Sequence, residues 1–362
     1  MQPRHKVSGA ILALATALLT ACGTPGVPLP PSLELAKPVG DLRAVRKGDK
    51  VYLAWTVPTQ TTDRQSIRHL GLTSVCRSFD PAMPTCGTLV GEVPPVQAPA
   101  PSTNKTGNGP KVQASFVDTL PKTLAEQNPT SEITYGISVM NASGRSPGFS
   151  NRVQVPAAST LPPPPDFKVQ LGPGGVTLTW GPAPELQTGG LSHFYRAYRR
   201  EEGTTAETEI GAAPLTASSF TDPTFEWEKT YNYRLTVVTI VSRAGHDSQV
   251  EGDDTPVVQV VAHDVFPPAV PSGLQAVASG VGQSPFIDLI WAPNTDADLA
   301  GYNIYRHEEG GTPVKINAQP VNTPGYRDSG VVSGKKYFYS VSAIDLRGNE
   351  SARSDEAYEA MP

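Results

Sequence analysis

The 362-residue chain combines few charged residues with many prolines and glycines. Charged residues make up 17% of the sequence, the formal net charge is -5, and there are 37 prolines and 33 glycines. This length is too great for one typical core and indicates two or three domains, and the turn-rich composition favours short strands over long helices. No basic cluster interrupts the modest negative charge, which excludes a nucleic-acid-binding surface.

Residues 1–21 have the pattern of a secretory signal peptide, with basic residues followed by an apolar run over residues 9–20. This run is too short to span a bilayer as a mature helix. Its end, Leu-Thr-Ala-Cys22-Gly23, resembles the lipobox of bacterial lipoprotein precursors. The resemblance implies cleavage before Cys22 and acylation of its thiol, which anchors the chain in a membrane. In such lipoproteins, Asp directly after the acylated cysteine favours retention in the inner membrane. Gly23 stands at this position, which favours the outer membrane or an outward-facing surface. An ordinary signal peptide that contains a cysteine is the alternative.

A proline-rich tether is predicted over residues 22–37. If this segment is extended at about 3.1 Å per residue, it holds the following domains up to roughly 45 Å from the membrane. No later segment approaches about twenty consecutive apolar residues, so no downstream membrane span is predicted.

The remaining cysteines, Cys76 and Cys86, lie ten positions apart in a chain expected to mature in an oxidising compartment. This context favours a disulfide, which would stabilise the fold by roughly 2–3 kcal/mol. A zinc site is the alternative, but two thiolates without a neighbouring Cys or His at ligand spacing make a poor one. We therefore predict a disulfide and no metal site.

Three segments of the chain carry the same ordered set of strand signals, which indicates an internal repeat. In each copy an early strand ends in a tryptophan, and a later strand ends in an aspartate. In the second and third copies a tyrosine, Tyr231 or Tyr337, follows that aspartate after nine residues. Alternation in the last copy places Tyr337, Tyr339, Val341 and Ala343 on one face of a strand, which predicts a half-buried sheet.

The first copy diverges from the other two. Ile133 stands where they have a tyrosine, and the third strand is predicted through Val75-Cys76-Arg77. A tract with little apolar bulk, from Pro94 to Pro110, is inserted and predicted to be a mobile surface loop. The disulfide is expected to pin the base of this insertion.

The motifs Pro-x-x-Leu, Leu-x-Trp, Gly-Tyr-x-Ile-Tyr-Arg and Tyr-x-Tyr-x-Val-x-Ala of the third copy resemble those of the fibronectin type III module. The resemblance implies an all-β fold of three tandem immunoglobulin-like antiparallel β-sandwiches. It places the modules at residues 38–157, with the inserted loop, and at residues 162–262 and 267–362. It also implies that three tryptophans are buried between the sheets and that two corner tyrosines bond back to the backbone. These residues are Trp55, Trp180 and Trp291, and Tyr231 and Tyr337. Ile133 cannot form the corner bond, so the first module should lack it.

No motif predicts a catalytic site. Gly144-Arg-Ser146-Pro-Gly148 matches the nucleophile-elbow pattern but lies between two predicted strands, which favours a hairpin turn. The histidines fall singly. Arg347-Gly348-Asn349 occupies the hairpin that carries Arg-Gly-Asp in one animal fibronectin module, but Asn replaces the carboxylate, so a turn is expected. Asp296, Asp298 and residues 252–254 lack the pattern of a calcium loop and are expected to be solvated or to cap strands.

Phe225 and Trp227 precede the corner tyrosine of the second module and are the candidate binding residues. Phe225 is expected to close the bottom of the sandwich. Two alternatives stay open for Trp227, which lies between Glu226 and Glu228. It is either an exposed contact for a protein or a sugar, or it packs against the neighbouring module.

These features predict a non-enzymatic, lipid-anchored envelope protein that acts in adhesion, as a scaffold or in ligand binding, without a cofactor. The expected partners are the membrane, through the N-terminal lipid, and another envelope protein or a polysaccharide, but no nucleic acid. One alternative is an accessory carbohydrate-binding subunit that tethers a separate glycan hydrolase. Another is an enzyme with an atypical site in the inserted region of the first module.

Overall fold

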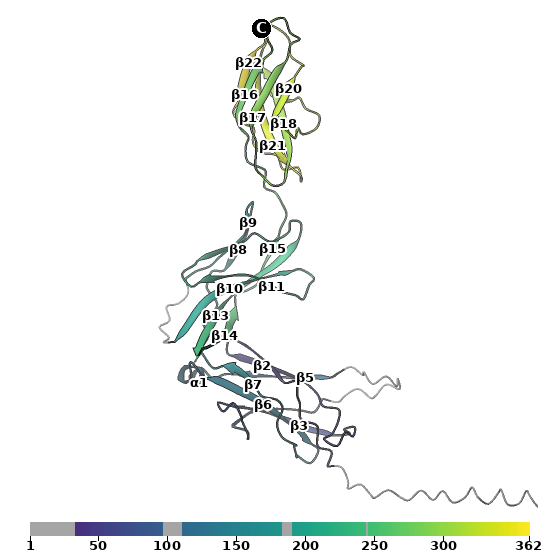
Figure 1. The fold of residues 1–362 in the computed structure, drawn as a ribbon, viewed down its shortest axis with the longest axis vertical. Helices are drawn as coiled ribbons and strands as arrows, with labels where there is room; N and C mark the ends of the chain where they lie inside the picture. The colour runs from purple at the N-terminus through teal and green to yellow at the C-terminus, as the bar shows by residue number, and fades with distance from the viewer. Residues whose placement is uncertain (1–32, 97–110, 183–189, 244) are drawn as a thin grey trace, which may run out of the picture. The chain divides into compact units, whose positions relative to one another are not determined.

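The computed structural model describes residues 33–96, 111–182, 190–243 and 245–362 (Figure 1). These residues form strands and loops with one short helix among them, α1 (Lys122–Gln127). The chain divides into two compact units, residues 1–157 and residues 158–362. Within the described ranges, no helix has the length and apolar character needed to cross a membrane. The predicted signal peptide, Cys22 and most of the tether lie outside the described residues.

The first module is a sandwich of two antiparallel sheets. One sheet pairs β1 (Arg43–Lys47) with β2 (Lys50–Thr56) and β2 with β5 (Gln113–Thr119). The other has the order β4 (Thr88–Val93), β3 (Leu70–Ser78), β6 (Glu132–Asn141) and β7 (Val153–Pro156). The alternating apolar residues of both sheets face inward, and α1 lies between β5 and β6 along the chain.

This module begins before Pro38, the start that the proline pattern suggests. Ala36 forms a β-bridge with Thr61 and is fully buried in the first core. The Lys37 backbone N–H also donates to the Gln60 carbonyl at 2.9 Å. Residues 33–37 therefore belong to the sandwich, because burial and backbone pairing hold them there.

The second module repeats the arrangement. One sheet has the order β12 (Ser219–Asp222), β9 (Gly175–Thr179) and β8 (Lys168–Gly172). In the other, β10 (Leu191–Glu201) lies between β11 (Thr208–Pro214) and β13 (Thr230–Arg243). Two consecutive segments, β14 (His246–Asp254) and β15 (Val258–Val261), pair with the far side of β13.

The third module is the most regular. Its sheets have the orders β16 (Ser272–Ala278), β17 (Ile287–Ala292), β20 (Gly325–Asp328) and β19 (Val314–Lys315), β18 (Leu299–Glu308), β21 (Lys336–Asp345), β22 (Ala357–Ala360). The predicted inward residues of β21 are all buried. The predicted fold class, three tandem antiparallel β-sandwiches, is confirmed.

The three tryptophans lie in the three cores. Trp55, Trp180 and Trp291 are at most 5% exposed, and each belongs to a separate buried cluster. Trp180 and Trp291 pack edge-on against Tyr195 and Tyr302 with ring centroids 5.0 and 5.1 Å apart. Such edge-to-face pairs add to the stability that area burial gives.

Candidate functional site

The most regular polar feature is an Arg–Asp–Tyr cluster that recurs in each module and connects its two sheets. In the third module, Oδ2 of Asp328 accepts hydrogen bonds from Oη of Tyr339 at 2.9 Å and from Nη1 of Arg306 at 2.7 Å. The equivalents are Arg77–Asp118–Tyr135 and Arg199–Asp222–Tyr233. Burial, and then the neighbouring carboxylate, raise the pKa of Tyr339. The cluster is closed and internally satisfied, so it is a structural bridge rather than an active site.

The corner tyrosines lie beside these clusters. Oη of Tyr231 accepts from the backbone N–H of Glu226 at 3.1 Å, and Oη of Tyr337 accepts from that of Val332 at 3.0 Å. In the first module Ile133 is buried at the equivalent place. Its side chain offers no hydroxyl to the loop before β6.

Cys76 and Cys86 are joined by a disulfide with a Cα–Cα distance of 5.4 Å. Cys76 lies on β3 and Cys86 lies in the connection to β4. The disulfide therefore closes the β3–β4 connection, and the expectation that it pins the base of the inserted tract is wrong because all of β4 separates the two. Of that tract, the structure describes only Pro94–Val96.

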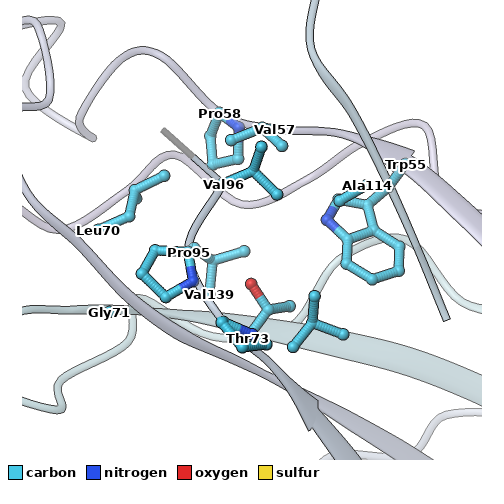
Figure 2. A pocket seen from close by; sticks show the side chains of 12 residues that line it. Trp55, Val57, Pro58, Leu70, Gly71, Thr73, Pro95, Val96, Ala114 and Val139 are labelled. Atoms are coloured by element: carbon cyan, nitrogen blue, oxygen red, sulfur yellow. The ribbon is translucent and has the colours of Figure 1, made fainter. Parts of the chain in front are cut away.

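A small cavity lies at one end of the first core, beside Trp55 (Figure 2). Thr73 lines this cavity. The equivalent residues of the other modules are Tyr195 and Tyr302, whose rings pack against the tryptophans of those modules. Pro95 and Val96 also line the cavity, and its space is about 10 Å³. A space of this size holds no more than about one water molecule, so the cavity is not a ligand site.

Ser146 lies in the connection between β6 and β7. Its Oγ is 2.6 Å from Oγ of Ser138 and accepts from the backbone N–H of Gly148 at 3.1 Å. A strand and not a helix follows it, so the geometry is a hairpin and does not expose a nucleophile.

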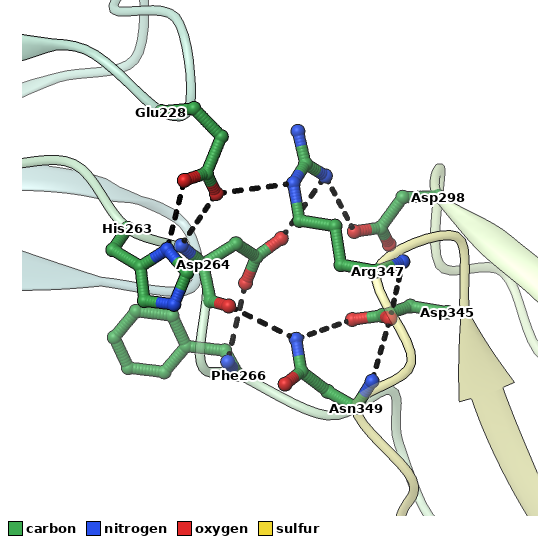
Figure 3. Close-up of polar contacts among 8 residues, drawn as sticks. All are labelled: Glu228, His263, Asp264, Phe266, Asp298, Asp345, Arg347 and Asn349. Carbon is green, nitrogen blue, oxygen red and sulfur yellow. Dashed lines mark hydrogen bonds and ion pairs between the residues drawn. The ribbon is translucent and has the colours of Figure 1, made fainter.

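The Arg347–Asn349 hairpin contacts the segment that joins the second and third modules (Figure 3). Nη1 of Arg347 lies 3.2 Å from Oδ2 of Asp264, and Nδ2 of Asn349 donates to the Asp264 carbonyl at 3.1 Å. Glu228 lies 3.5 Å from Nε of Arg347 and 2.8 Å from Nδ1 of His263. The hydrogen bond to His263 lowers the pKa of Glu228. The hairpin therefore makes its contacts within the chain, at the joint between the second and third modules.

Trp227 is half-buried at the same joint. Its ring packs edge-on against Phe225 at 4.7 Å and lies 6.1 Å from the ring of Phe266. The guanidinium of Arg347 lies 5.8 Å from its centroid. Trp227 therefore contacts both the segment between the modules and the third module, and its ring stays partly exposed. Phe225 packs against the second core.

Within the described residues, one group of acidic side chains is close enough to hold a metal ion: Asp264, Asp298 and Asp345, whose oxygens lie within 4.8 Å of one another. Arg347 already supplies a positive charge within this group. Its guanidinium contacts Asp264 and Asp298, and its backbone N–H donates to Oδ1 of Asp345 at 2.8 Å. Burial opposes ionisation of Asp345, but hydrogen bonds from Asn349 and Arg347 outweigh it and lower the pKa.

No protein-family model matches this chain. Among curated proteins it is similar to a segment of an amylopullulanase from Thermoanaerobacterium thermosulfurigenes, 43% identical over 102 residues, which covers 27% of this chain and 5% of that enzyme. It is also similar to a segment of exoglucanase B from Cellulomonas fimi, 28% identical over 187 residues, which covers 49% of this chain and 15% of that enzyme. The chain thus spans only a small part of these relatives.

Two solved structures are also similar. A Fn3-like protein from Clostridium thermocellum is 35% identical and covers 26% of this chain and 94% of its own, with a TM-score of 0.23. The FN1–FN3 segment of chicken CNTN1 is 15% identical and covers 90% of this chain and 98% of its own, with a TM-score of 0.26.

The described strands of each module form one sheet of three strands and a second sheet that carries the corner position. The modules have the fibronectin type III fold. All-β modules of this fold serve many functions, so function must be argued from surfaces and not from the fold.

Proposed function

We propose that the chain is a non-catalytic accessory protein that binds glycans, anchored to the cell envelope through lipid on Cys22. The observation that carries the glycan part is the similarity to segments of two glucan-degrading enzymes, an amylopullulanase and an exoglucanase. Each similarity covers no more than 15% of the enzyme. The shared part is therefore a module that such enzymes carry in addition to much other sequence.

The engagement of the described candidate side chains in other contacts supports the non-catalytic part of the proposal. In the ranges that the structure describes, the buried carboxylates of the Arg–Asp–Tyr clusters are bonded to arginine and tyrosine. Ser146 bonds within its own hairpin. These side chains hold the sandwiches together and leave no nucleophile beside a base.

The test uses the chain from Gly23 onward and insoluble starch and cellulose. The protein is mixed with each polysaccharide and sedimented, and the release of reducing ends is measured in the same tubes. We expect saturable co-sedimentation with at least one glucan and no release of reducing ends. Protein that stays in the supernatant with every polysaccharide contradicts glycan binding, and release of reducing ends contradicts the non-catalytic role.

The proposed anchor needs its own test, because it rests on the sequence motif alone. Mass spectrometry of the N-terminal peptide from membranes of the native organism should show a diacyl- or triacyl-modified Cys22. An unmodified N-terminus at another position contradicts the anchor and leaves glycan binding untouched.

A further inference from the structure

The outer face of the β1–β2–β5 sheet carries an exposed apolar row. Val45, Tyr52 and Val117 lie directly opposite one another on the three strands. Their side chains are 66%, 45% and 46% exposed. Exposed apolar residues are ordinary one at a time, but a contiguous row across three strands is not.

The other two modules show that the fold does not require this row. At the position of Tyr52 the second module has Thr177, whose hydroxyl lies 3.3 Å from that of Thr221. The third module has Asp288, which pairs with both Nε and Nη2 of Arg327 at 2.7 Å. The same sheet therefore accepts a hydroxyl or an ion pair, and the aromatic ring of Tyr52 is not needed for packing.

The ring of Tyr52 is also open. Tyr358, another exposed tyrosine, has Nζ of Lys336 over its ring at 4.0 Å. Within the described ranges no cation or second aromatic ring covers Tyr52. The ring of Tyr52 is therefore available to a ligand, whereas the ring of Tyr358 is already in contact with Lys336.

Hydrogen-bonding side chains continue the same face beyond the apolar row. Nη2 of Arg43 donates to Gln113 at 3.4 Å, and Nε2 of Gln113 donates to Oγ1 of Thr56 at 2.8 Å. Thr56 in turn donates to Asp41 at 2.6 Å. The hydrogen bond from Thr56 lowers the pKa of Asp41. A hollow of about 300 Å³ adjoins this end of the face and is lined by Asp41, Thr56 and residues 57–60.

We propose that this face, from Tyr52 to Asp41, binds a neutral glycan chain. The inference rests on the proposed function and names its site. A pyranose ring has an apolar C–H surface that packs on an aromatic ring and a rim of hydroxyls that bond to carboxylate, amide and guanidinium groups. Tyr52 and Thr56 are four residues apart on one strand, which is about 13 Å, so the face accommodates a short stretch of chain rather than one sugar.

A protein partner fits this face less well. A stable protein interface buries about 800 Å² on each side around an apolar centre. Here three apolar residues are bordered by Arg43, the small half-buried Ala54 and Ser115 on one side, and by Lys47, Lys50 and Thr119 on the other. This row is too narrow for such a centre.

The test is native affinity electrophoresis of the chain from Gly23 onward through gels that contain soluble starch, pullulan or hydroxyethyl cellulose. Three variants are compared: Tyr52→Thr, which copies the residue of the second module, Tyr52→Phe, which keeps the ring, and Tyr358→Ala as the exposed-tyrosine control. Circular dichroism and the melting temperature show whether each variant is folded. We expect Tyr52→Thr to weaken retardation about tenfold, and Tyr52→Phe and Tyr358→Ala to change it less than about twofold.

The outcomes separate the site from the function. If the natural chain is retarded and folded Tyr52→Thr is retarded equally, the site is wrong and the proposed function stands. If the natural chain is not retarded by any of the three glucans and also fails to sediment with insoluble starch or cellulose, the proposed function fails. If Tyr52→Thr keeps full retardation but loses a protein captured from native membranes, the face binds protein and the proposal is overturned.

Discussion

Replacing Asp328 by alanine should destabilise the third module far more than replacing another ion-paired aspartate of the same sheet. The side chain of Asp328 is 6% exposed, and that of its partner Arg306 is 25% exposed. The substitution leaves the guanidinium and the Tyr339 hydroxyl without their shared acceptor. It also removes the bond from the Gly330 backbone N–H to Oδ1, which measures 2.8 Å.

The expected magnitude follows from burial. Removing one partner of a buried ion pair costs about 3–5 kcal/mol, and an unpaired buried hydroxyl costs about 1–3 kcal/mol. Because Arg306 keeps some contact with water, we take the low end, about 3 kcal/mol for the whole change. Asp288→Ala is the matched control. Its ion pair with Arg327 is 46% and 58% exposed, so its loss should cost less than about 1 kcal/mol.

Hydrogen–deuterium exchange of the full chain resolves the effect by module. Backbone amides of β17 and β21 should exchange about 100-fold faster in Asp328→Ala and less than about fivefold faster in Asp288→Ala. The first and second modules should keep their protection in both variants. Equal effects of the two substitutions on β17 and β21 would refute the structural role assigned to the Arg–Asp–Tyr cluster.

Three further outcomes are expected. Burial, and then the Glu251 carboxylate, raise the pKa of Tyr198 to about 12, and the pKa values of the cluster tyrosines are raised as well. Because an unfolded tyrosine ionises near pH 10, the stabilisation from these shifts should be full below about pH 10 and fall as pH rises towards 12. The last part of the rise in absorbance at 295 nm should therefore coincide with the loss of the β circular dichroism signal, and a rise that is complete while the protein is still folded would contradict this. Reduction of the disulfide should lower the unfolding free energy of the first module by about 2–3 kcal/mol, seen as faster amide exchange in β3 and β6 but not in β18 and β21; unchanged exchange in β3 would count against it. Arg347→Ala should speed amide exchange in residues 263–270 about fivefold, because it removes the counter-charge of buried Asp264. It should leave the retardation by glucans unchanged. Unaltered amide exchange in residues 263–270 would show that the Arg347–Asp264 ion pair does not stabilise the joint.

The sequence predicted the strands well because its repeats align and its alternation is clean. The cores around the three tryptophans follow from that alternation. The Arg–Asp–Tyr clusters were missed, although their aspartates mark the repeat, since Arg306 and Asp328 lie on different sheets and sequence spacing does not show which arginine reaches across. The repeated arginine on the third strand of every copy was the available signal.

The surface was harder to predict. Trp227 drew attention because glutamates flank it, yet the joint with Phe266 and Arg347 partly buries it, and only tertiary contacts decide that. Tyr52 is placed outward by simple alternation with Val51 and Leu53. Its importance appears only when the register sets Val45 and Val117 beside it.

The central claim is that these sandwiches bind glucan without cleaving it. An equilibrium binding isotherm of the chain from Gly23 onward on insoluble starch and cellulose, with reducing ends assayed at every point, tests this most directly. The account predicts a saturable isotherm on at least one of them and a reducing-end signal no higher than that of the polysaccharide alone. A flat isotherm on both, or reducing ends that increase with protein concentration, would contradict it.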